Sequence, residues 1–382
     1  MGEARATTLT SGMKVTPSVH LVRPLGAGGM GAVWLADHLG LKTQVVVKFM
    51  LDGLDASTNA RARFSREAAA AAQVKSPHVV QMLDHGLTDD GVPFIVMEYL
   101  EGRDLAAVLA ERGALEPAEV VTVVAQVAKA LSRVHAAGLL HRDIKPDNIF
   151  VCEGEDELFV KLLDFGIAKS HGEAKDGPLD GDTKTGQVVG TPFYMSPEQV
   201  TAQKEVDARS DLWSLAVVAF EALTGQRPFD GPSFGALAVK IATGECPKPS
   251  SVHPALPPSV DDWFARACAK NPADRYASAK ELAEALREAF VGVVSLPPAT
   301  SMSDSGSRGR SSDGGSSGER RVEVGSGPRS ASPTFGLAPT IEEPAPAEAL
   351  ARSEPGSVVV GGGSGEAARR GSRVGLFVLV AA

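Results

Sequence analysis

The sequence of 382 residues predicts an α+β protein in which a small strand-rich lobe precedes a larger helical lobe and a disordered tail. Three observations support this prediction. Short apolar runs rich in β-branched residues gather between residues 20 and 99, whereas longer apolar patterns of helical period follow between residues 117 and 290. Beyond residue 296 the composition turns to Gly, Ser and Pro, which bury too little apolar area to offset the entropy of ordering.

The first lobe is expected to hold strands and one main helix. Residues 45–47 are three consecutive valines, as in a buried strand, and residues 94–97 form a second apolar run. Between these runs, residues 61–74 contain five consecutive alanines, and alanine is the strongest helix former. The pattern therefore predicts a sheet with one helix inserted between its strands.

The second lobe is expected to be mostly helical. Pro117 suits the first turn of a helix that runs to about residue 136. Residues 211–223 are strongly apolar, which predicts a buried helix, and residues 261–268 and 279–290 predict two more.

Charge and cysteine content disfavour several classes of function. The net charge of −9 disfavours a general nucleic-acid-binding role. The three cysteines, Cys152, Cys246 and Cys268, are scattered and form no C-x-x-C motif. They fit a reducing cytosol better than a disulfide framework or a zinc site.

One loop carries most of the chemical information. Residues 141–148, His-Arg-Asp-Ile-Lys-Pro-Asp-Asn, place the carboxylate of Asp143, the cation of Lys145 and the amide of Asn148 close together. Asp164, followed by Phe and Gly, comes shortly afterwards. A proton acceptor, a cation and hard oxygen ligands for Mg²⁺ are the groups that phosphoryl transfer needs. A polar loop capped by Asp and Asn is the structural alternative, but it does not explain the order of these groups.

A glycine-rich segment lies near the start of the first lobe. Gly26, Gly28, Gly31 and Val33 fit the pattern G-x-G-x-x-G-x-V, in which glycines let backbone N–H groups approach phosphates. Dinucleotide-binding folds use a similar string, but a helix follows it there, whereas residues 33–36 continue as a strand. The segment therefore predicts a phosphate-binding hairpin.

Lys48 ends the next apolar strand and is expected to contact the α- and β-phosphates of ATP. Its ammonium group needs a carboxylate to hold it in place, and Glu67 on the predicted alanine-rich helix is the candidate. The alternative is that Glu67 lies on an ordinary solvated helix face.

Three further segments, residues 190–199, 207–215 and 271–276, complete a pattern that spans both lobes. With them, residues from about 20 to 291 resemble a protein kinase, and specifically a bacterial eukaryotic-like Ser/Thr kinase. The resemblance implies a bilobal protein kinase fold over residues 19–291, with the first lobe at 19–99 and the second at 100–291. Lys145 and Thr191 match the Ser/Thr pattern rather than the tyrosine pattern.

The resemblance also implies the roles of site residues. Residues 98–100 would form the hinge beside the adenine, with Met97 behind it. Val46 and Phe150 stand where the family usually has Ala and Leu, so a tighter adenine pocket is expected. Beyond the glycine-rich segment and Lys48, the residues expected to line the ATP site are Leu25, Val33, Val46, Met97, Glu98, Leu100 and Phe150.

The implied activity is transfer of the γ-phosphate of Mg-ATP to Ser or Thr hydroxyls of protein substrates in signal transduction, with Mn²⁺ as an alternative metal. Asp143 would orient the substrate hydroxyl, and Lys145 would offset charge on the moving phosphoryl group. Asn148 and Asp164 would hold the metal. A catalytically inactive kinase scaffold is one alternative, and a small-molecule phosphotransferase is another. The complete set of charged groups disfavours the first, and residues 190–198 disfavour the second.

Substrate docking and activation are assigned by the same resemblance. Thr191 and Glu198 fall in the substrate-docking segment, where Arg275 is expected to pair with Glu198. Thr183 and Thr185 are expected to be sites of autophosphorylation that order their loop. Their phosphates would pair with Arg142, aided by Lys169.

The regions outside the kinase-like part carry further expectations. Residues 1–18 are an N-terminal extension without the apolar run of a signal peptide. Residues 292–373 are expected to be a disordered Gly/Ser/Pro-rich linker. Within it, Thr334 and Thr340 each directly follow a proline and would present phosphothreonine to a partner domain, unless the linker is an inert spacer.

The last residues, 374–382, are an apolar run that follows Arg369, Arg370 and Arg373. A membrane-spanning helix needs about 20 apolar residues, so this run would be only the start of one. If the sequence is a piece of a longer protein, we expect a membrane anchor with the kinase-like part on the cytoplasmic side. If it is not, we expect weak and reversible membrane contact at most.

Overall fold

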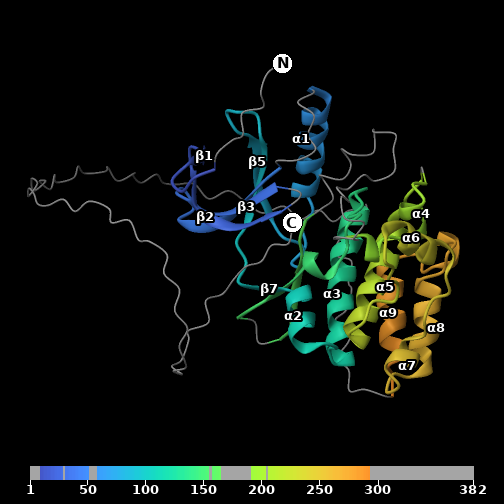
Figure 1. Ribbon diagram of the computed structural model, residues 1–382. Helices are drawn as coiled ribbons and strands as arrows, with labels where there is room; N and C mark the ends of the chain where they lie inside the picture. Colours follow the sequence, from blue (N-terminus) through green and yellow to red (C-terminus); the bar gives the residue numbers. More distant parts are fainter. Residues whose placement is uncertain are drawn as a thin grey trace, which may run out of the picture. The chain divides into compact units, whose positions relative to one another are not determined.

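The computed structural model describes residues 9–28, 31–50, 58–154, 157–164, 191–203 and 205–292 (Figure 1). Several expectations lie outside these residues. They concern Thr183 and Thr185, Lys169, the linker with Thr334 and Thr340, and the apolar run at 374–382.

The first lobe is an antiparallel sheet of six strands in the order β1-β2-β3-β4-β6-β5, with one helix, α1, inserted between β4 and β5. The predicted strands at 45–47 and 94–97 fall within β4 and β6, and the predicted helix at 61–74 overlaps α1. These predictions are confirmed. The elements are β1 Lys14–Thr16, β2 Val19–Gly28, β3 Gly31–His38, β4 Thr43–Phe49, α1 Thr58–Ala72, β5 Met82–Leu87 and β6 Pro93–Glu98.

The centre of this sheet is buried on both faces. Residues 31–36 of β3 and 45–49 of β4 are all buried, which explains their continuous apolar sequence. The register sets Val33 opposite Lys48 and Val46 opposite Met97. The end of β4 is thereby fixed beside the glycine-rich hairpin formed by β2 and β3.

The second lobe is mostly helical, as predicted, and carries a small sheet in the order β7-β8-β9. Its strands are β7 Gly102–Asp104, β8 Ile149–Cys152 and β9 Phe159–Leu162. Its helices are α2 Leu105–Arg112, α3 Pro117–Ala136, α4 Pro197–Val200, α5 Ala208–Thr224, α6 Phe234–Thr243, α7 Pro249–Val252, α8 Pro258–Ala267 and α9 Ala279–Ala289. Short 3-10 turns lie at Pro146–Asn148, Thr191–Tyr194 and Pro272–Asp274.

Helix α5 is the centre of the second lobe. Thirteen of its seventeen residues are buried, so it is surrounded by protein rather than exposed on one face. It packs against α3, α7 and α8, and α3 packs in turn against α9 (Figure 1). The Asp207 side chain caps its first turn, and Gly225 ends it in the left-handed conformation that glycine adopts without strain.

The two lobes are joined by backbone hydrogen bonds as well as by the chain. Residues 76–81 follow α1 and run beside β9 of the second lobe. The Val80 N–H donates to the Leu162 carbonyl at 3.0 Å, and the Leu162 N–H donates to the His78 carbonyl at 2.9 Å. The strand that leads to Asp164 is therefore attached directly to the first lobe.

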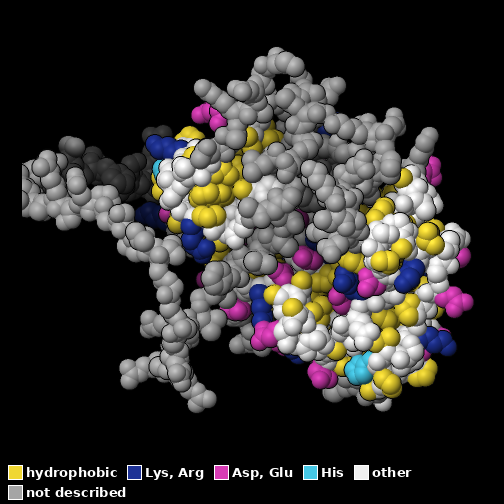
Figure 2. All heavy atoms as spheres, viewed as in Figure 1, with side chains coloured by type: hydrophobic (Ala, Val, Ile, Leu, Met, Phe, Trp, Pro, Cys, Tyr) yellow, Lys and Arg dark blue, Asp and Glu magenta, His cyan; other side chains and the backbone are white. Residues whose placement is uncertain are grey.

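Two surface properties bear on function. On the face shown in Figure 2, acidic and basic side chains are interspersed over the helical lobe rather than separated by sign. Among the described residues, none of the helices is both long and apolar enough to cross a membrane.

Candidate active site

The loop between α3 and β8 brings three predicted site residues together. The Asn148 Nδ2 atom donates to the Asp143 carbonyl at 2.8 Å and to its carboxylate at 3.1 Å. The Lys145 ammonium lies 3.6 Å from the same carboxylate. All three side chains are buried. The Asp143 carboxylate is thus held by an amide on one side and a cation on the other.

The same geometry orients Asn148 for a metal. Because Nδ2 points at Asp143, the amide oxygen is the atom that can face a cation. Amide and carboxylate oxygens suit Mg²⁺, which takes few protein ligands and completes its shell with water and phosphate. Asn148 and Asp164 therefore fit the role predicted for them.

Asp211, in the first turn of α5, holds this loop in place. Its carboxylate accepts the backbone N–H groups of His141 and Arg142 at 3.0 and 2.8 Å, and it lies 2.8 Å from His135 Nε2. Burial alone would raise the pKa of Asp211. The hydrogen bonds from the His135 ring and from the His141 backbone N–H outweigh that effect, and the pKa lies below its ordinary value.

The role of Asp211 in anchoring the loop was not predicted from the sequence. The available signal was a carboxylate in the first turn of an otherwise apolar helix. A buried carboxylate requires partners, and its partners are the backbone of a loop about 70 residues away.

His141 connects the loop to the strand that carries Asp164. Its Nε2 atom lies 2.7 Å from the Leu163 carbonyl, and its Nδ1 atom accepts the Asp143 N–H at 3.3 Å. A carbonyl only accepts, so Nε2 carries the hydrogen. Burial lowers the pKa of His141, which favours this neutral tautomer. A second link is the Leu163 N–H, which donates to the Asn148 carbonyl at 2.8 Å.

Lys48 reaches across from the first lobe and forms an ion pair with Asp164 at 2.7 Å. Both side chains are largely buried. The sequence analysis expected Glu67 to hold Lys48. Glu67 lies half-buried on α1, and its pairing with Lys48 stays a prediction. The structure thus joins the predicted phosphate-binding cation directly to a predicted metal ligand.

The residues predicted to line the adenine site also lie together. Phe150 is buried in a small apolar cluster with Val80 and Leu163, and Met97 and Leu100 pack against it. Val46 faces Met97 across the sheet. Leu25 and Gly26 lie half-buried on β2 near the hairpin. Contact of these residues with adenine stays a prediction.

Glu98 differs from the other predicted adenine-site residues. Its carboxylate accepts from the Gln81 N–H at 2.7 Å and from the Lys161 ammonium at 2.6 Å. The side chain is engaged by these two groups, and contact of Glu98 with a nucleotide stays a prediction.

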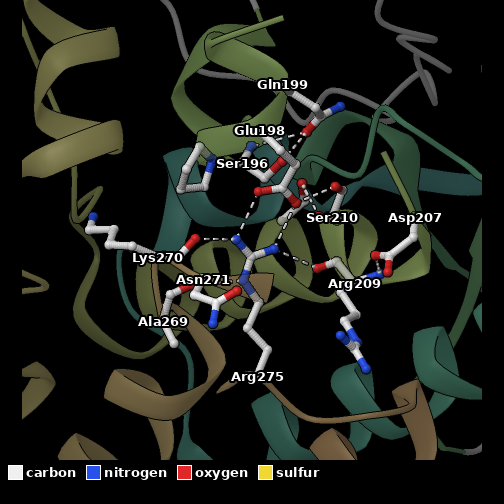
Figure 3. Close-up of polar contacts among 12 residues, drawn as sticks. Ser196, Glu198, Gln199, Asp207, Arg209, Ser210, Ala269, Lys270, Asn271 and Arg275 are labelled. Atoms are coloured by element: carbon white, nitrogen blue, oxygen red, sulfur yellow. Dashed lines mark hydrogen bonds and ion pairs between the residues drawn. The ribbon is translucent and has the colours of Figure 1, made fainter. Parts of the chain in front are cut away.

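The predicted pair of Glu198 and Arg275 is confirmed. The guanidinium binds the carboxylate through two hydrogen bonds of 2.7 and 2.8 Å, and Ser210 Oγ also donates to it (Figure 3). Arg275 further donates to backbone carbonyls, including those of Ala269 and Arg209 (Figure 3). The two charged side chains are 0% and 2% exposed, so the pair is fully enclosed.

This ion pair supports the docking segment and the catalytic loop together. Burial raises the pKa of Glu198, but the hydrogen bonds from Arg275 and Ser210 outweigh it, and the pKa is lowered. Gln199, the next residue in α4, donates from Nε2 to the Arg142 carbonyl at 3.2 Å. Thr191 begins the short turn before α4, and its role in docking stays a prediction.

Comparison with known proteins places the chain in a family. The protein kinase domain family matches residues 19–290, which is more than half of the sequence. The chain belongs to the protein kinase family.

Two named kinases illustrate the similarity. Serine/threonine-protein kinase pkn3 of Myxococcus xanthus is 43% identical over 259 residues, which are 67% of this chain and 47% of that protein. Serine/threonine-protein kinase PknH of Mycobacterium tuberculosis is 41% identical over 271 residues, which are 71% of this chain and 42% of that protein. The chain thus spans less than half the length of these relatives.

The fold of this kinase is similar to a solved one. The crystal structure of the M. tuberculosis PknI kinase domain matches with a TM-score of 0.59 and 32% identity, covering 74% of this chain and 99% of that domain. The bilobal kinase fold expected from the sequence is confirmed.

The buried ion pair generates a prediction about stability and pH. Replacing Arg275 with Met should lower the free energy of unfolding by about 3–5 kcal/mol near neutral pH, because Glu198 stays buried without a partner. In the wild type, the lowered pKa of Glu198 means that its stabilisation is lost as pH falls through that value. In Arg275→Met the pKa of Glu198 should instead be raised, so acidification should favour its folded state.

The stability difference between wild type and Arg275→Met should therefore shrink as pH falls from about 7 to about 4, as measured by urea unfolding at each pH. Lys280→Met is the matched control. It breaks an exposed pair with Glu284 and should change stability by less than about 0.5 kcal/mol throughout. A difference for Arg275→Met that grows on acidification would contradict the assignment.

The anchoring role of Asp211 gives a second prediction. In Asp211→Asn, an amide NH₂ would face a donor N–H of the loop, so we expect a loss of about 2–4 kcal/mol in unfolding free energy. The exposed Asp262 on α8 supplies the control Asp262→Asn, which should be nearly neutral. Equal unfolding free energies of the two variants in urea would show that Asp211 does not stabilise the loop in this way.

Proposed function

We propose that this kinase is catalytically active and transfers the γ-phosphate of Mg-ATP to Ser or Thr hydroxyls of protein substrates. The observation that carries the proposal is the convergence of Lys48, Asp143, Lys145, Asn148 and Asp164 from two lobes. The names of the relatives, serine/threonine-protein kinases, favour the same activity. Lys145 and Thr191 match the Ser/Thr pattern.

Asp143 is the group that orients the substrate hydroxyl and accepts its proton. Its carboxylate is buried and held by Asn148, so it is positioned before substrate arrives. Lys145, at 3.6 Å, offsets negative charge on the phosphoryl group as it moves to the acceptor oxygen. Protein groups thus supply position and charge, which is the main requirement of this reaction.

Asn148 and Asp164 would hold the metal, and Mn²⁺ is an alternative to Mg²⁺. When bound, the metal would offset the negative charge of the phosphates. Lys48 would bind the α- and β-phosphates. The Lys48–Asp164 contact uses one N–H group of the ammonium and one carboxylate oxygen, so the remaining groups would be available to phosphates and metal.

Two alternatives are disfavoured by specific observations. A scaffold without catalysis would not need the enclosed arrangement of Asp143, Lys145 and Asn148. A small-molecule phosphotransferase would not need the docking segment that Glu198 and Arg275 hold in place. Phosphate transfer to a panel of peptides, compared with aminoglycoside and choline substrates, separates the second alternative from our proposal.

The proposal predicts that Asp143→Asn, Asp164→Asn and Lys48→Met each reduce phosphotransfer by about 100-fold or more, because each removes a charge aimed at the reacting groups. The measurement is Mg²⁺-dependent transfer of labelled phosphate from ATP to a generic protein substrate. Circular dichroism and thermal unfolding confirm that each variant is folded, and Asp262→Asn again serves as control. Wild-type turnover by a folded Asp164→Asn variant would exclude the proposed site.

Autophosphorylation of Thr183 and Thr185 is the proposed means of activation. A phosphothreonine carries about −1.5 to −2 charge and would pair with Arg142, whose backbone is already fastened to Asp211 and Gln199. After incubation with Mg-ATP, mass spectrometry should find phosphate on one or both threonines. The double variant Thr183→Ala/Thr185→Ala should lose most of its activity, and full activity in this unphosphorylated variant would refute the switch.

Partners and location follow as further proposals. Substrates are proteins, including other copies of this chain, and nucleic acid is not a substrate. Phosphorylated Thr334 or Thr340 would bind a phosphothreonine-recognising domain. The kinase domain is cytoplasmic, and the run at 374–382 with its basic flank would tether it to a membrane in a longer protein.

A further inference from the structure

Lys161 joins the two lobes at a point away from the catalytic carboxylates. It lies on β9 in the second lobe, and its ammonium group reaches Glu98 Oε1, at the end of β6 in the first lobe, at 2.6 Å. The same oxygen accepts the Gln81 N–H at 2.7 Å. The lysine and glutamate side chains are 17% and 26% exposed, so solvent screens this pair only in part.

Each member of the pair is a neighbour of residues predicted to line the nucleotide pocket, which are Phe150 on the side of the second lobe and Met97 and Val46 on the side of the first. On one side, Lys161 is the cross-strand partner of Phe150, which is buried. On the other side, Glu98 directly follows Met97, which faces Val46. A change in the Lys161–Glu98 distance would therefore change the spacing between Phe150 and Val46.

Backbone hydrogen bonds close this connection into a ring. The Glu98 N–H donates to the Gln81 carbonyl at 3.0 Å, and the Val80 N–H donates to the Leu162 carbonyl at 3.0 Å. Leu162 follows Lys161, whose side chain returns to Glu98. One lobe cannot rotate against the other at this edge without breaking a member of the ring.

The Lys161–Glu98 pair differs from the Lys48–Asp164 pair in its expected role during the reaction. In the proposed reaction, Lys48 and Asp164 would also bind phosphates and metal. Lys161 and Glu98 have no such competing partner in the proposed reaction, so their contact can persist through the cycle. An ordinary exposed ion pair would contribute little, but here the carboxylate is held both by the lysine and by a backbone N–H.

We infer that Lys161 is a positioning residue that sets the spacing of the nucleotide pocket through Glu98. The inference rests on the proposed function, because it concerns affinity for the nucleotide that the kinase would use. Lys161 acts on the hinge backbone through Glu98 and touches no reacting atom. Its loss should therefore weaken nucleotide binding more than it slows phosphate transfer.

The test compares Lys161→Met, Glu98→Gln and the double variant with the wild type. We expect both single variants to raise the Kd for ADP, measured by calorimetry, and the KM for ATP by about 3- to 10-fold, while kcat changes far less. The double variant should be no worse than either single variant, because the two residues act as one pair. Lys161→Arg should restore most of the affinity, since it keeps the charge and the reach.

Lys280→Met, which removes an exposed lysine from a pair on α9, is the control and should leave nucleotide affinity unchanged. A folded Lys161→Met variant with wild-type ADP affinity would overturn the inference, as would fully additive losses in the double variant. These results are separable from failure of the proposed function. In that case the wild type itself would bind no nucleotide or transfer no phosphate.

Discussion

The buried carboxylate of Asp211 is the interaction on which the active site depends. It stands at the first turn of α5 and receives two backbone N–H groups of the catalytic loop together with the His135 ring. A loop rich in polar groups cannot be buried unless those groups find partners, and Asp211 supplies them. The position of Asp143 is therefore fixed by the core of the helical lobe, through the bonds between Asp211 and the loop backbone.

Charged pairs in this kinase serve two distinct purposes. The Glu198–Arg275 pair is enclosed by protein and makes several hydrogen bonds, so it is expected to stay intact while the protein is folded. The Lys48–Asp164 pair holds two charges that have other partners during the proposed reaction. Burial and the number of hydrogen bonds distinguish the two pairs, since a pair that binds further groups cannot be enclosed on every side.

Much of the fold and of the candidate site could be predicted from the sequence. Local patterns predicted β4, β6, α1, α3 and α5, because apolar period and capping residues are short-range signals. The order of motifs predicted the grouping of Asp143, Lys145 and Asn148. The sequence did not reveal Asp164 as the partner of Lys48, Asp211 as the anchor of the loop, or the contact between Lys161 and Glu98. Each of these contacts joins residues far apart in the chain, so only tertiary packing, within the second lobe or between the lobes, brings them together.

The burial of α5 on all sides has a consequence for local unfolding of this kinase. A helix surrounded by apolar neighbours cannot unfold locally without exposing the whole lobe core, so its amide hydrogens should exchange with solvent only through global unfolding. The catalytic loop is fastened to this helix and shares its protection. The amide hydrogens of His141 and Arg142, which bond to Asp211, should therefore exchange about as slowly as those of α5.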